Sequence, residues 1–365
     1  MGFNCGIVGL PNVGKSTIFN ALTRSNALAA NYPFATIDPN VGIVQVPEKR
    51  LAVLTDIVPT KKIVSTSIEI VDIAGIVKGA SQGEGLGNQF LSHIAEVDAI
   101  IEVVRCFESK DIVHVSGTVD PLRDIEVIQT ELILKDLEVL SKHRTRYEKA
   151  GKAGDKKAAQ VLDLLARFEK TLNEGKPART VALTADEKAQ LKEVHFMTAK
   201  PILYAANVAE EDLGKPDNAH VASVRKHAAA EGSAMITISG KIEEEISKLD
   251  TVEREEFLKA MNLTESGLDQ LVREGYKLLG LITFFTVGET ENRAWTTERG
   301  STAPQAAGKI HSDFEKGFIR AEVMSFDDFV KYRGEQGAKT AGRFRLEGKE
   351  YLVQDGDIMH FRFSV

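Results

Sequence analysis

An eight-residue segment near the start of the chain restricts the possible folds more than any other feature. Residues 9–16 read Gly-Leu-Pro-Asn-Val-Gly-Lys-Ser, which fits the pattern G-x-x-x-x-G-K-S/T. An apolar run at 3–9 leads into this segment and a helical pattern from Lys15 onward follows it, as a phosphate-binding loop requires. The segment therefore predicts a buried strand, a glycine-containing loop and a helix that together hold a polyphosphate.

The residue types of this loop suit a magnesium-bound nucleoside triphosphate. Glycines let the backbone turn tightly, so that successive N–H groups face the phosphates, and the positive end of the following helix adds to the attraction. Lys15 is predicted to reach the outer phosphates, and the Ser16 hydroxyl is predicted to bind magnesium. The expected chemistry is attack of water on the terminal phosphoryl group, with Lys15 and magnesium stabilising the developing charge.

A second element, further along the chain, supports the same interpretation. Asp72 ends the apolar run 67–71, where a carboxylate can hold magnesium through water. The N–H of Gly75, three residues later, can meet the terminal phosphate. Thr36 lies in the intervening loop and is a candidate for completing the magnesium shell. Ser16, Thr36 and Asp72 are therefore the predicted metal ligands.

The residues after a later strand bear on which purine is bound. Guanine-specific hydrolases of this class use the motif N-K-x-D, in which the aspartate accepts hydrogens from the guanine ring. The run 202–206 ends here in Asn207-Val208-Ala209-Glu210, with a longer carboxylate and with valine in place of lysine. A misplaced acceptor removes the preference for guanine, so we predict relaxed or adenine-favouring specificity. The alternative is that Asn207 only caps a strand–loop junction.

The glutamine that positions water in Ras-type proteins is missing. Ile76 stands in its place, and isoleucine can neither orient nor activate water. Hydrolysis then needs another group or a partner. His114 is a candidate because histidine can polarise water near neutral pH, although spacing alone favours a structural role for a lone histidine.

Composition and charge indicate a folded protein in a reducing compartment. The chain has 365 residues, of which 43% are hydrophobic and 27% are charged, which suits two or three domains. The net charge of −7 excludes a globally basic nucleic-acid binder, so such a contact must come from a local patch. Cys5 and Cys106 lie in apolar runs, without metal or redox spacing. No signal-peptide pattern and no membrane-spanning apolar run is found, so we expect a cytoplasmic protein.

Hydrophobic periodicity predicts an α/β chain with a helical insertion. Strand-like apolar runs alternate with helical patterns, which indicates a doubly wound, mostly parallel sheet. These runs are 3–9, 63–72, 99–104, 201–207 and 234–239. Between the third and the fourth run, two amphipathic helical stripes flank Gly151 and Gly154 and predict an antiparallel helical hairpin.

The composition changes again near Gly280 and predicts a small C-terminal α+β domain. Its expected elements are a strand at 281–287 with a hairpin partner at 294–297, a helix at 304–314, a hairpin around 347–349 and a final strand at 358–363. The predicted organisation is a P-loop domain at 1–124 and 196–280, a helical insertion at 125–195 and the C-terminal domain at 281–365.

Four stretches along the chain together carry a family resemblance. They are GLPNVGKS at 9–16, DIAGIVKGASQGEGLGNQFL at 72–91, NVAE at 207–210 and APQAAGKIHSDFEKGFIRAE at 303–322. They resemble the YchF, or Obg-like, ATPase family within the translation-factor class of P-loop GTPases, over essentially the whole chain. The resemblance implies a P-loop G domain, an inserted α-helical coiled-coil domain and a C-terminal TGS domain of the β-grasp type. It also implies slow ATP hydrolysis in preference to GTP, ribosome association and roles in stress response.

The resemblance assigns phosphate, metal and base contacts to individual positions. The phosphate contacts fall on Asn12, Val13, Gly14, Lys15, Ser16 and Thr17. The magnesium ligands fall on Ser16 and Thr36, and the base contacts fall on Asn207 and Val208, beside Glu210. Within the loop 238–241, Gly240 departs from the Ser-Ala-Lys that G domains often carry, which leaves a base-side contact there open.

The resemblance also bears on catalysis and on a second cofactor. The hydrophobic replacement for glutamine falls on Ile76, and the proposed catalytic histidine of the family falls on His114. This changes our interpretation of His114 from structural to catalytic. The predicted catalytic residues are therefore Lys15, Gly75 and His114. Asn12 matches an asparagine that coordinates potassium in related GTPases, so potassium is predicted beside magnesium.

The middle of the helical insertion is predicted to be a basic tip. From Lys142 to Lys157, seven basic residues stand against two acidic ones, which gives a local net charge of +5. Such a patch on a negative chain suits RNA phosphates, and the alternative is an ordinary solvated helix surface. We therefore expect the ribosome or ribosomal RNA to bind through this tip and the TGS domain.

The sequence as a whole predicts a monomeric, translation-associated ATPase that acts as a nucleotide-gated switch. Two alternatives stay open at this point: a conventional GTPase, and a non-catalytic adaptor that binds the ribosome and only senses nucleotide. Ile76 keeps the second alternative open. A small-molecule kinase is disfavoured, because no separate acceptor site or lid arginine pattern is visible.

Overall fold

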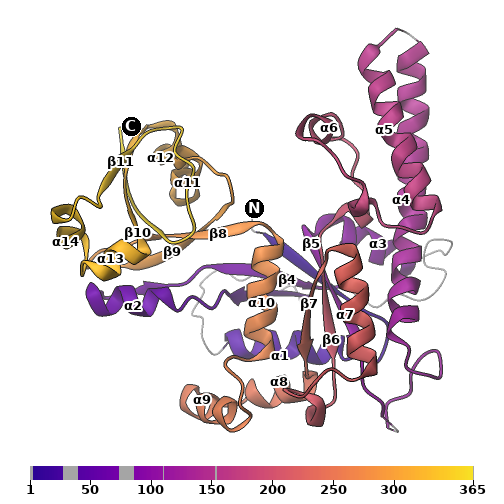
Figure 1. Cartoon of the computed structure of the whole chain (residues 1–365), viewed down its shortest axis with the longest axis horizontal. Helices are drawn as coiled ribbons and strands as arrows, with labels where there is room; N and C mark the ends of the chain where they lie inside the picture. The colour runs from indigo at the N-terminus through magenta and orange to yellow at the C-terminus, as the bar shows by residue number, and fades with distance from the viewer. Residues whose placement is uncertain (1–2, 28–39, 74–85, 110, 153, 365) are drawn as a thin grey trace. The chain divides into compact units, whose positions relative to one another are not determined.

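The computed structural model describes residues 3–27, 40–73, 86–109, 111–152 and 154–364. The chain divides into two compact units, Met1–Ile43 with Glu69–Leu271 and Val44–Ile68 with Val272–Val365. Two six-stranded sheets form the frameworks of these units (Figure 1). A short early segment of the chain therefore belongs to the unit that is otherwise formed by the C-terminal part, which the sequence analysis did not anticipate.

The sheet of the first unit is mostly parallel, as predicted. Its strand order is β2-β4-β1-β5-β6-β7. β1 pairs in parallel with β4 and β5, β5 with β6, and β6 with β7. The bounds are β1 (Asn4–Val8), β2 (Val41–Gln45), β4 (Ser67–Asp72), β5 (Ala99–Arg105), β6 (Ile202–Asn207) and β7 (Ala234–Ile238). Every residue of β5 and β6 is buried, which is typical of central strands covered on both faces.

The connections of this sheet place a crevice beside β1. From β1 the chain continues to β2 and β4 on one side of it and then to β5 on the other. Ligands bind at such a reversal, outside the carboxyl ends of parallel strands. α1 (Lys15–Ala27), α3 (Leu86–Glu96) and α7 (Ala219–Glu231) lie in connections between these strands, and α8 (Gly240–Ile246), α9 (Thr251–Ala260) and α10 (Gly267–Leu278) follow β7.

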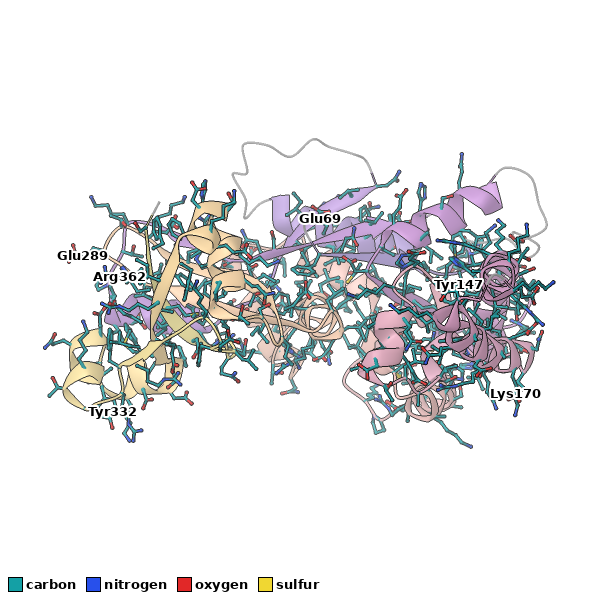
Figure 2. All side chains as sticks on the ribbon, turned by 90° about the horizontal axis from the view of Figure 1, so that it is seen from above. Glu69, Tyr147, Lys170, Glu289, Tyr332 and Arg362 are labelled. Atoms are coloured by element: carbon teal, nitrogen blue, oxygen red, sulfur yellow. The ribbon has the colours of Figure 1, made fainter. Side chains whose placement is uncertain are left out.

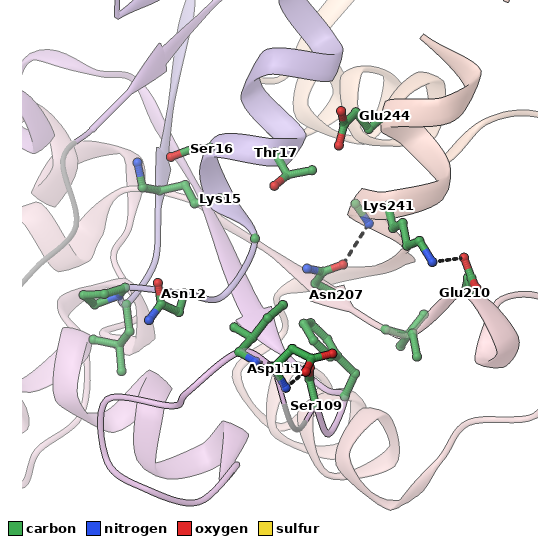
Figure 3. Close-up of a pocket in the computed structure, with 18 of the residues that line it drawn as sticks. Asn12, Lys15, Ser16, Thr17, Ser109, Asp111, Asn207, Glu210, Lys241 and Glu244 are labelled. Atoms are coloured by element: carbon green, nitrogen blue, oxygen red, sulfur yellow. Dashed lines mark hydrogen bonds and ion pairs between the residues drawn. The ribbon is translucent and has the colours of Figure 1, made fainter. Parts of the chain in front are cut away.

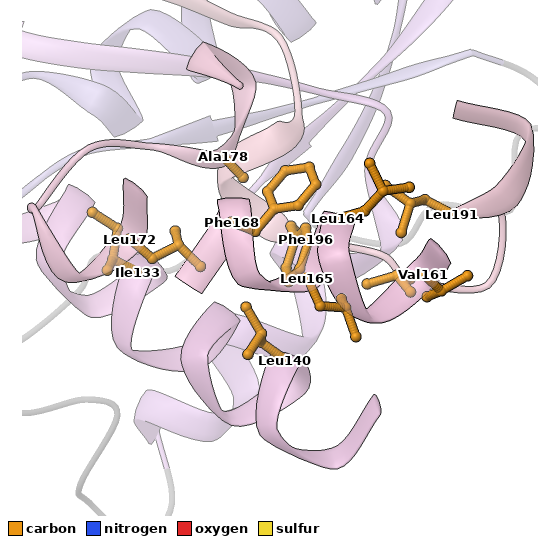
Figure 4. Close-up of a cluster of buried hydrophobic side chains, with 11 residues drawn as sticks. Ile133, Leu140, Val161, Leu164, Leu165, Phe168, Leu172, Ala178, Leu191 and Phe196 are labelled. Carbon is orange, nitrogen blue, oxygen red and sulfur yellow. The ribbon is translucent and has the colours of Figure 1, made fainter. Parts of the chain in front are cut away.

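A long helical hairpin separates β5 from β6 in sequence, as predicted. α4 (Pro121–Lys152) and α5 (Lys156–Asn173) lie side by side (Figure 1), and Figure 2 shows their side chains around Tyr147 and Lys170. Asp155 caps α5 by accepting from the N–H groups of Lys157 and Ala158. The interior is apolar: Leu140, Val161, Leu165, Phe168 and Leu172 pack there (Figure 4). The hairpin is confirmed, and its treatment as a separate domain with the bounds given above stays a prediction.

A short irregular segment closes the base of this hairpin before β6. It contains η1 (Ala178–Thr180), α6 (Ala185–Gln190) and η2 (Met197–Ala199). Asp136 of α4 is wholly buried and accepts from the N–H groups of Met197 and Thr198, at 2.7 and 2.9 Å. Since an unpaired buried carboxylate is costly, these bonds hold α4 to the segment that leads into β6.

The second unit contains a mixed sheet of order β11-β10-β12-β8-β9-β3. β8 pairs antiparallel with β9, and β10 pairs antiparallel with β11 and β12, whereas β12 and β8 are parallel. The strand bounds are β3 (Ile63–Val64), β8 (Leu281–Thr286), β9 (Asn292–Glu298), β10 (Phe318–Ser325), β11 (Arg345–Glu347) and β12 (Asp357–Phe363). The helices are α2 (Arg50–Ile57), α11 (Ala303–Ile310), α12 (Ser312–Lys316), α13 (Phe326–Lys331) and α14 (Glu335–Thr340).

Three predicted elements are wrong in detail. The single strand expected at 63–72 is two strands in different sheets, because β3 pairs with β9 whereas β4 pairs with β1. The helix expected at 304–314 is interrupted at His311, whose backbone is extended and whose ring accepts from the Asp313 N–H to begin α12. The hairpin expected around 347–349 does not form, because β11 pairs with β10 and not with the strand that follows.

One buried carboxyl group of the first sheet is not part of any predicted site. Glu102 of β5 is 3% exposed, near Arg179, Glu231 and the neighbouring strand residue Tyr204. Burial raises the pKa of Glu102 to about 8; Arg179 opposes this rise and Glu231 adds to it. In the folded chain this side chain therefore keeps its proton to a higher pH than in the unfolded chain.

We expect the substitution Glu102→Gln to remove a pH dependence of stability. The folded-state pKa of about 8 lies above the ordinary value of 4.5, so the folded protein binds the extra proton between these values. The free energy of unfolding of the unmodified chain should fall as pH rises through this window, by up to about 1.4 kcal/mol per pH unit. Urea unfolding at several pH values measures this. Glu126→Gln, at an exposed position of α4, is the control. If the free energy of unfolding depends on pH in the same way with and without Glu102→Gln, the expectation is contradicted.

Candidate functional site

A pocket of about 1250 Å³ lies at the carboxyl ends of the parallel strands of the first unit (Figure 3). The residues that line it follow β1, β4, β5, β6 and β7 in sequence, where binding sites of such sheets form. From the predicted site it includes Asn12, Gly14, Lys15, Ser16, Thr17, Asp72, Asn207, Val208 and Glu210. The structure thus brings together residues that stand up to about two hundred positions apart in sequence.

The loop between β1 and α1 has the backbone that its sequence requires. Gly14 has a φ of +95°, and a Cβ at this position would lie 2.2 Å from the amide nitrogen of Asn207. Only glycine therefore fits, for reasons of both conformation and space. Asn12 also has a positive φ, of +64°, which asparagine tolerates better than most residues. The Ile18 N–H bonds the Gly14 carbonyl, which starts the helix directly behind the loop.

Lys15 and Asp72 meet at one end of the pocket as an ion pair. Their side chains are 11% and 18% exposed, and the hydroxyl-bearing Ser16 and Thr17 line the same pocket. Hydroxyl and carboxylate oxygens are the ligands that magnesium prefers, so Ser16 and Asp72 fit the metal predicted from the sequence. Thr36, Gly75 and Ile76 lie outside the described residues, so their predicted roles stay predictions.

Asn207 connects two of the loops that form the pocket. It is 4% exposed, its amide nitrogen donates to the Val13 carbonyl at 2.8 Å, and its amide oxygen accepts from the Gly240 N–H at 2.9 Å (Figure 3). Asn207 therefore does more than cap the end of β6. It fixes the spacing between the phosphate loop and the loop that follows β7.

The opposite end of the pocket is rich in carboxylates. Val208 is buried there, and its N–H donates to the Ile238 carbonyl at 2.8 Å. Lys241 pairs with Glu210 at 2.7 Å (Figure 3). Besides Asp72 and Glu210, the acidic side chains that line the pocket are Glu108, Asp111, Glu211 and Glu244. Lys241 was not predicted as a site residue; its signal in the sequence was the Ser-Gly-Lys that follows β7.

His114 is buried and both of its ring nitrogens are hydrogen-bonded. Nε2 lies 2.8 Å from a carboxylate oxygen of Asp124, in the first turn of α4, and Nδ1 accepts from the Ser116 N–H at 3.1 Å. Since Nδ1 accepts a hydrogen, we assign the proton of a neutral ring to Nε2. His114 is not among the described residues that line the pocket. In this arrangement neither ring nitrogen can bind a water molecule.

The loop that carries His114 is nevertheless attached to the phosphate loop. Asn12 donates from its side-chain nitrogen to the Val113 carbonyl at 3.1 Å. Arg105, 1% exposed at the end of β5, donates to the carbonyls of Phe107 and Ile112 at 3.1 and 3.0 Å. Neither Arg105 nor Asp124 was predicted as a site residue, and nothing in the spacing of either residue points to these contacts.

Comparisons with known proteins assign these features to a family. One family model, described as a 50S ribosome-binding GTPase, matches residues 4–141. Another, named YchF-GTPase_C and described as a protein of unknown function (DUF933), matches residues 281–364. A protein of Bacillus subtilis (strain 168) named ribosome-binding ATPase YchF is 54% identical over 366 residues, with 100% of each chain covered. The chain belongs to the YchF family.

Other members agree over the whole length of this YchF-family chain. A protein of the same name from Escherichia coli O157:H7 is 53% identical over 365 residues, again with 100% of each chain covered. The solved structure of the Schizosaccharomyces pombe YchF GTPase has a TM-score of 0.86 and 38% identity, and the match covers 99% of this chain and 98% of that one. The resemblance and the P-loop fold class are therefore confirmed. Among the described residues, no helix has the length and apolar character needed to span a bilayer.

We expect His114→Ala to destabilise the fold, in addition to any effect on hydrolysis. The substitution leaves one oxygen of the buried Asp124 carboxylate without its 2.8 Å partner, while Arg123 still donates to the other oxygen. The free energy of unfolding should therefore fall by about 1–3 kcal/mol. Urea unfolding measures this loss. His195→Ala, at an exposed position of the same unit, should change stability by no more than about 0.5 kcal/mol. Equal stability of the two variants would show that the bond to Asp124 contributes nothing.

Proposed function

We propose that this chain is a ribosome-associated ATPase that hydrolyses ATP to ADP and phosphate and acts as a nucleotide-dependent switch in translation or stress response. The observation that carries the proposal is the meeting of Lys15, Ser16 and Asp72 at one end of a single pocket, in a chain that matches ribosome-binding ATPases from end to end. The proposed location is the cytoplasm, and the proposed assembly state is a monomer.

The phosphate end of the pocket supports ATP hydrolysis. Lys15 would contact the outer phosphates of ATP. The backbone N–H groups of residues 12–17 would face the remaining phosphate oxygens. The proposed magnesium ligands are Ser16, Thr36 and Asp72, and bound magnesium would supply charge stabilisation for the leaving phosphate oxygens. A triphosphate offers Lys15 a new anionic partner, which would release the Asp72 carboxylate for the metal. Potassium, predicted through Asn12, rests on the family resemblance.

The purine would lie at the end of the pocket formed by Asn207, Val208 and Glu210. Asn207 is proposed to hold the loops there in addition to meeting the purine edge, given its bonds to Val13 and Gly240. Val208 supplies an apolar surface where guanine-specific proteins carry a lysine.

The proposed catalytic groups are Lys15, the Gly75 N–H and His114. The ring of His114 would have to leave Asp124 before it could orient water, because both nitrogens are now bonded. Asp124 stands in the first turn of α4, so hydrolysis would depend on the position of this helix. This favours slow hydrolysis by the isolated chain and faster hydrolysis with a partner bound to the hairpin.

The hairpin tip is the proposed contact for ribosomal RNA, together with the C-terminal TGS domain. Two of its seven basic residues are neutralised: Arg144 pairs with Glu148 and Glu169, and Arg146 pairs with Glu193. Because Glu169 and Glu193 lie outside the segment 142–157, the local charge of +5 overstates what a partner meets. Among the described side chains of the tip, the exposed lysines that supply the remaining contact are Lys142, Lys149, Lys152 and Lys157.

Multiple-turnover phosphate release with ATP and magnesium tests the enzymatic part of the proposal. We expect Lys15→Ala to lower the rate by about 100-fold or more, as loss of a group that stabilises transition-state charge does. Lys259→Ala, on the exposed surface of α9, should leave the rate unchanged. A rate for the unmodified chain no higher than that of Lys15→Ala would instead favour a nucleotide-sensing adaptor. A strong preference for GTP would favour a conventional GTPase.

Co-sedimentation with ribosomes at increasing salt tests the binding surface. Alanine at Lys142, Lys149, Lys152 and Lys157 together should weaken binding by about tenfold or more. The fourfold substitution should also make the plot of the logarithm of the binding constant against the logarithm of the salt concentration less steep. The slope should fall by up to about one for each RNA phosphate that a lysine no longer neutralises. The control carries alanine at four exposed lysines elsewhere, Lys215, Lys226, Lys259 and Lys277. If both sets weaken binding equally, the tip is not the contact.

A further inference from the structure

Guanine and adenine need different hydrogen-bond partners along the Watson–Crick edge, where the two bases differ. Guanine presents the acceptor O6 beside the donors N1–H and N2–H₂, whereas adenine presents the donor N6–H₂ beside the acceptor N1. A site that selects guanine must therefore offer an unoccupied carboxylate and an unoccupied N–H group. A site that lacks these partners loses the discrimination that buried hydrogen bonds provide.

The carboxylate that would accept from the guanine donors, that of Glu210, is already paired with Lys241. Glu210 begins η3 (Glu210–Asp212), directly after β6, and Lys241 is the second residue of α8, after β7. β6 and β7 are neighbours, with Asn207 opposite Ile238, so the two loops lie together. Nζ of Lys241 and a carboxylate oxygen of Glu210 are 2.7 Å apart (Figure 3). The hydrogen bond to Glu210 raises the pKa of Lys241.

The N–H group that could meet a purine acceptor is also bonded within the protein. Gly240, the first residue of α8, donates its N–H to the amide oxygen of Asn207 at 2.9 Å. Asn207 is buried, and its other amide atom is bonded to the phosphate loop, so it has little freedom to release Gly240. The two groups that would recognise guanine are therefore bonded to other residues of the same pocket.

We propose that Lys241 is a specificity-determining residue, which bonds the Glu210 carboxylate and so keeps it from the guanine donors. The proposal rests on the proposed function, because it assumes that a purine triphosphate occupies this pocket. Lys241 and Glu210 are 66% and 42% exposed, and such exposed ion pairs contribute little to stability. The pair is thus poorly explained as a structural device, whereas both members line the pocket.

The test compares the dissociation constants of ATP and GTP, with magnesium present, by competition against a fluorescent nucleotide analogue. Lys241→Met keeps most of the length and apolar stem of the side chain but removes the charge that holds Glu210. We expect GTP binding to strengthen relative to ATP by roughly tenfold to a hundredfold, the effect of one hydrogen bond to a charged group. Lys259→Met, on the exposed surface of α9, is the matched control and should leave the ratio unchanged.

A double variant identifies the group that lysine controls. In the double variant K241M/E210Q no carboxylate remains at position 210, so the gain in GTP binding should disappear. A gain that survives in the double variant would overturn the assignment of Glu210 as the group held by Lys241.

The remaining outcomes separate this proposal from the proposed function. If Lys241→Met leaves the ratio unchanged or weakens GTP binding while ATP still binds, the lysine does not act against guanine and the inference is wrong, but the ATPase stands. If the unmodified chain binds neither ATP nor GTP, or if Lys15→Ala leaves the binding of both nucleotides unchanged, both the proposed function and the inference fail.

Discussion

The nucleotide pocket depends on one buried side-chain amide. Asn207 joins the phosphate loop, through the Val13 carbonyl, to the loop that begins α8, through the Gly240 N–H. A buried amide that loses a partner costs about 1–3 kcal/mol, so the spacing between the two loops is held firmly. The same contact explains why position 14 must be glycine, since a Cβ there would overlap the Asn207 amide. The sequence motif at 9–16 is thus completed by a residue nearly two hundred positions away.

A second set of bonds attaches the loop after β5 to both the phosphate loop and the helical hairpin. Asn12 holds the Val113 carbonyl, and the next residue, His114, is bonded to Asp124 at the start of α4. Arg105 holds the same loop from the end of β5. A displacement of α4 would therefore move the backbone that Asn12 contacts. This gives the hairpin a physical connection to the phosphate loop that does not require any residue of the hairpin to enter the pocket.

The sequence predicted the parts of this structure that depend on local patterns. The phosphate loop, the parallel strands and the helical hairpin each follow from a motif or a periodicity within one short segment. The strand expected at 63–72 failed because partner choice is not local: Ile63 and Val64 pair with β9, whereas Ser67–Asp72 pairs with β1. Asp124 and Lys241 were missed for the same reason, since the partners that define their roles come from other loops.

The two ends of the pocket differ in how freely they can change. The phosphate loop contains two residues of positive φ, Asn12 and Gly14, and is held by the buried hydrogen bonds of Asn207, so that a substitution at Gly14 or Asn207 disturbs the fold itself. The end where we propose that the purine lies carries Lys241 and Glu210, whose side chains are 66% and 42% exposed and whose ion pair adds little to stability. If Lys241 has the role that we propose, base preference shifts by surface substitutions that leave the phosphate loop unchanged. The same fold then serves ATP-preferring and GTP-preferring proteins that hold the triphosphate in the same way.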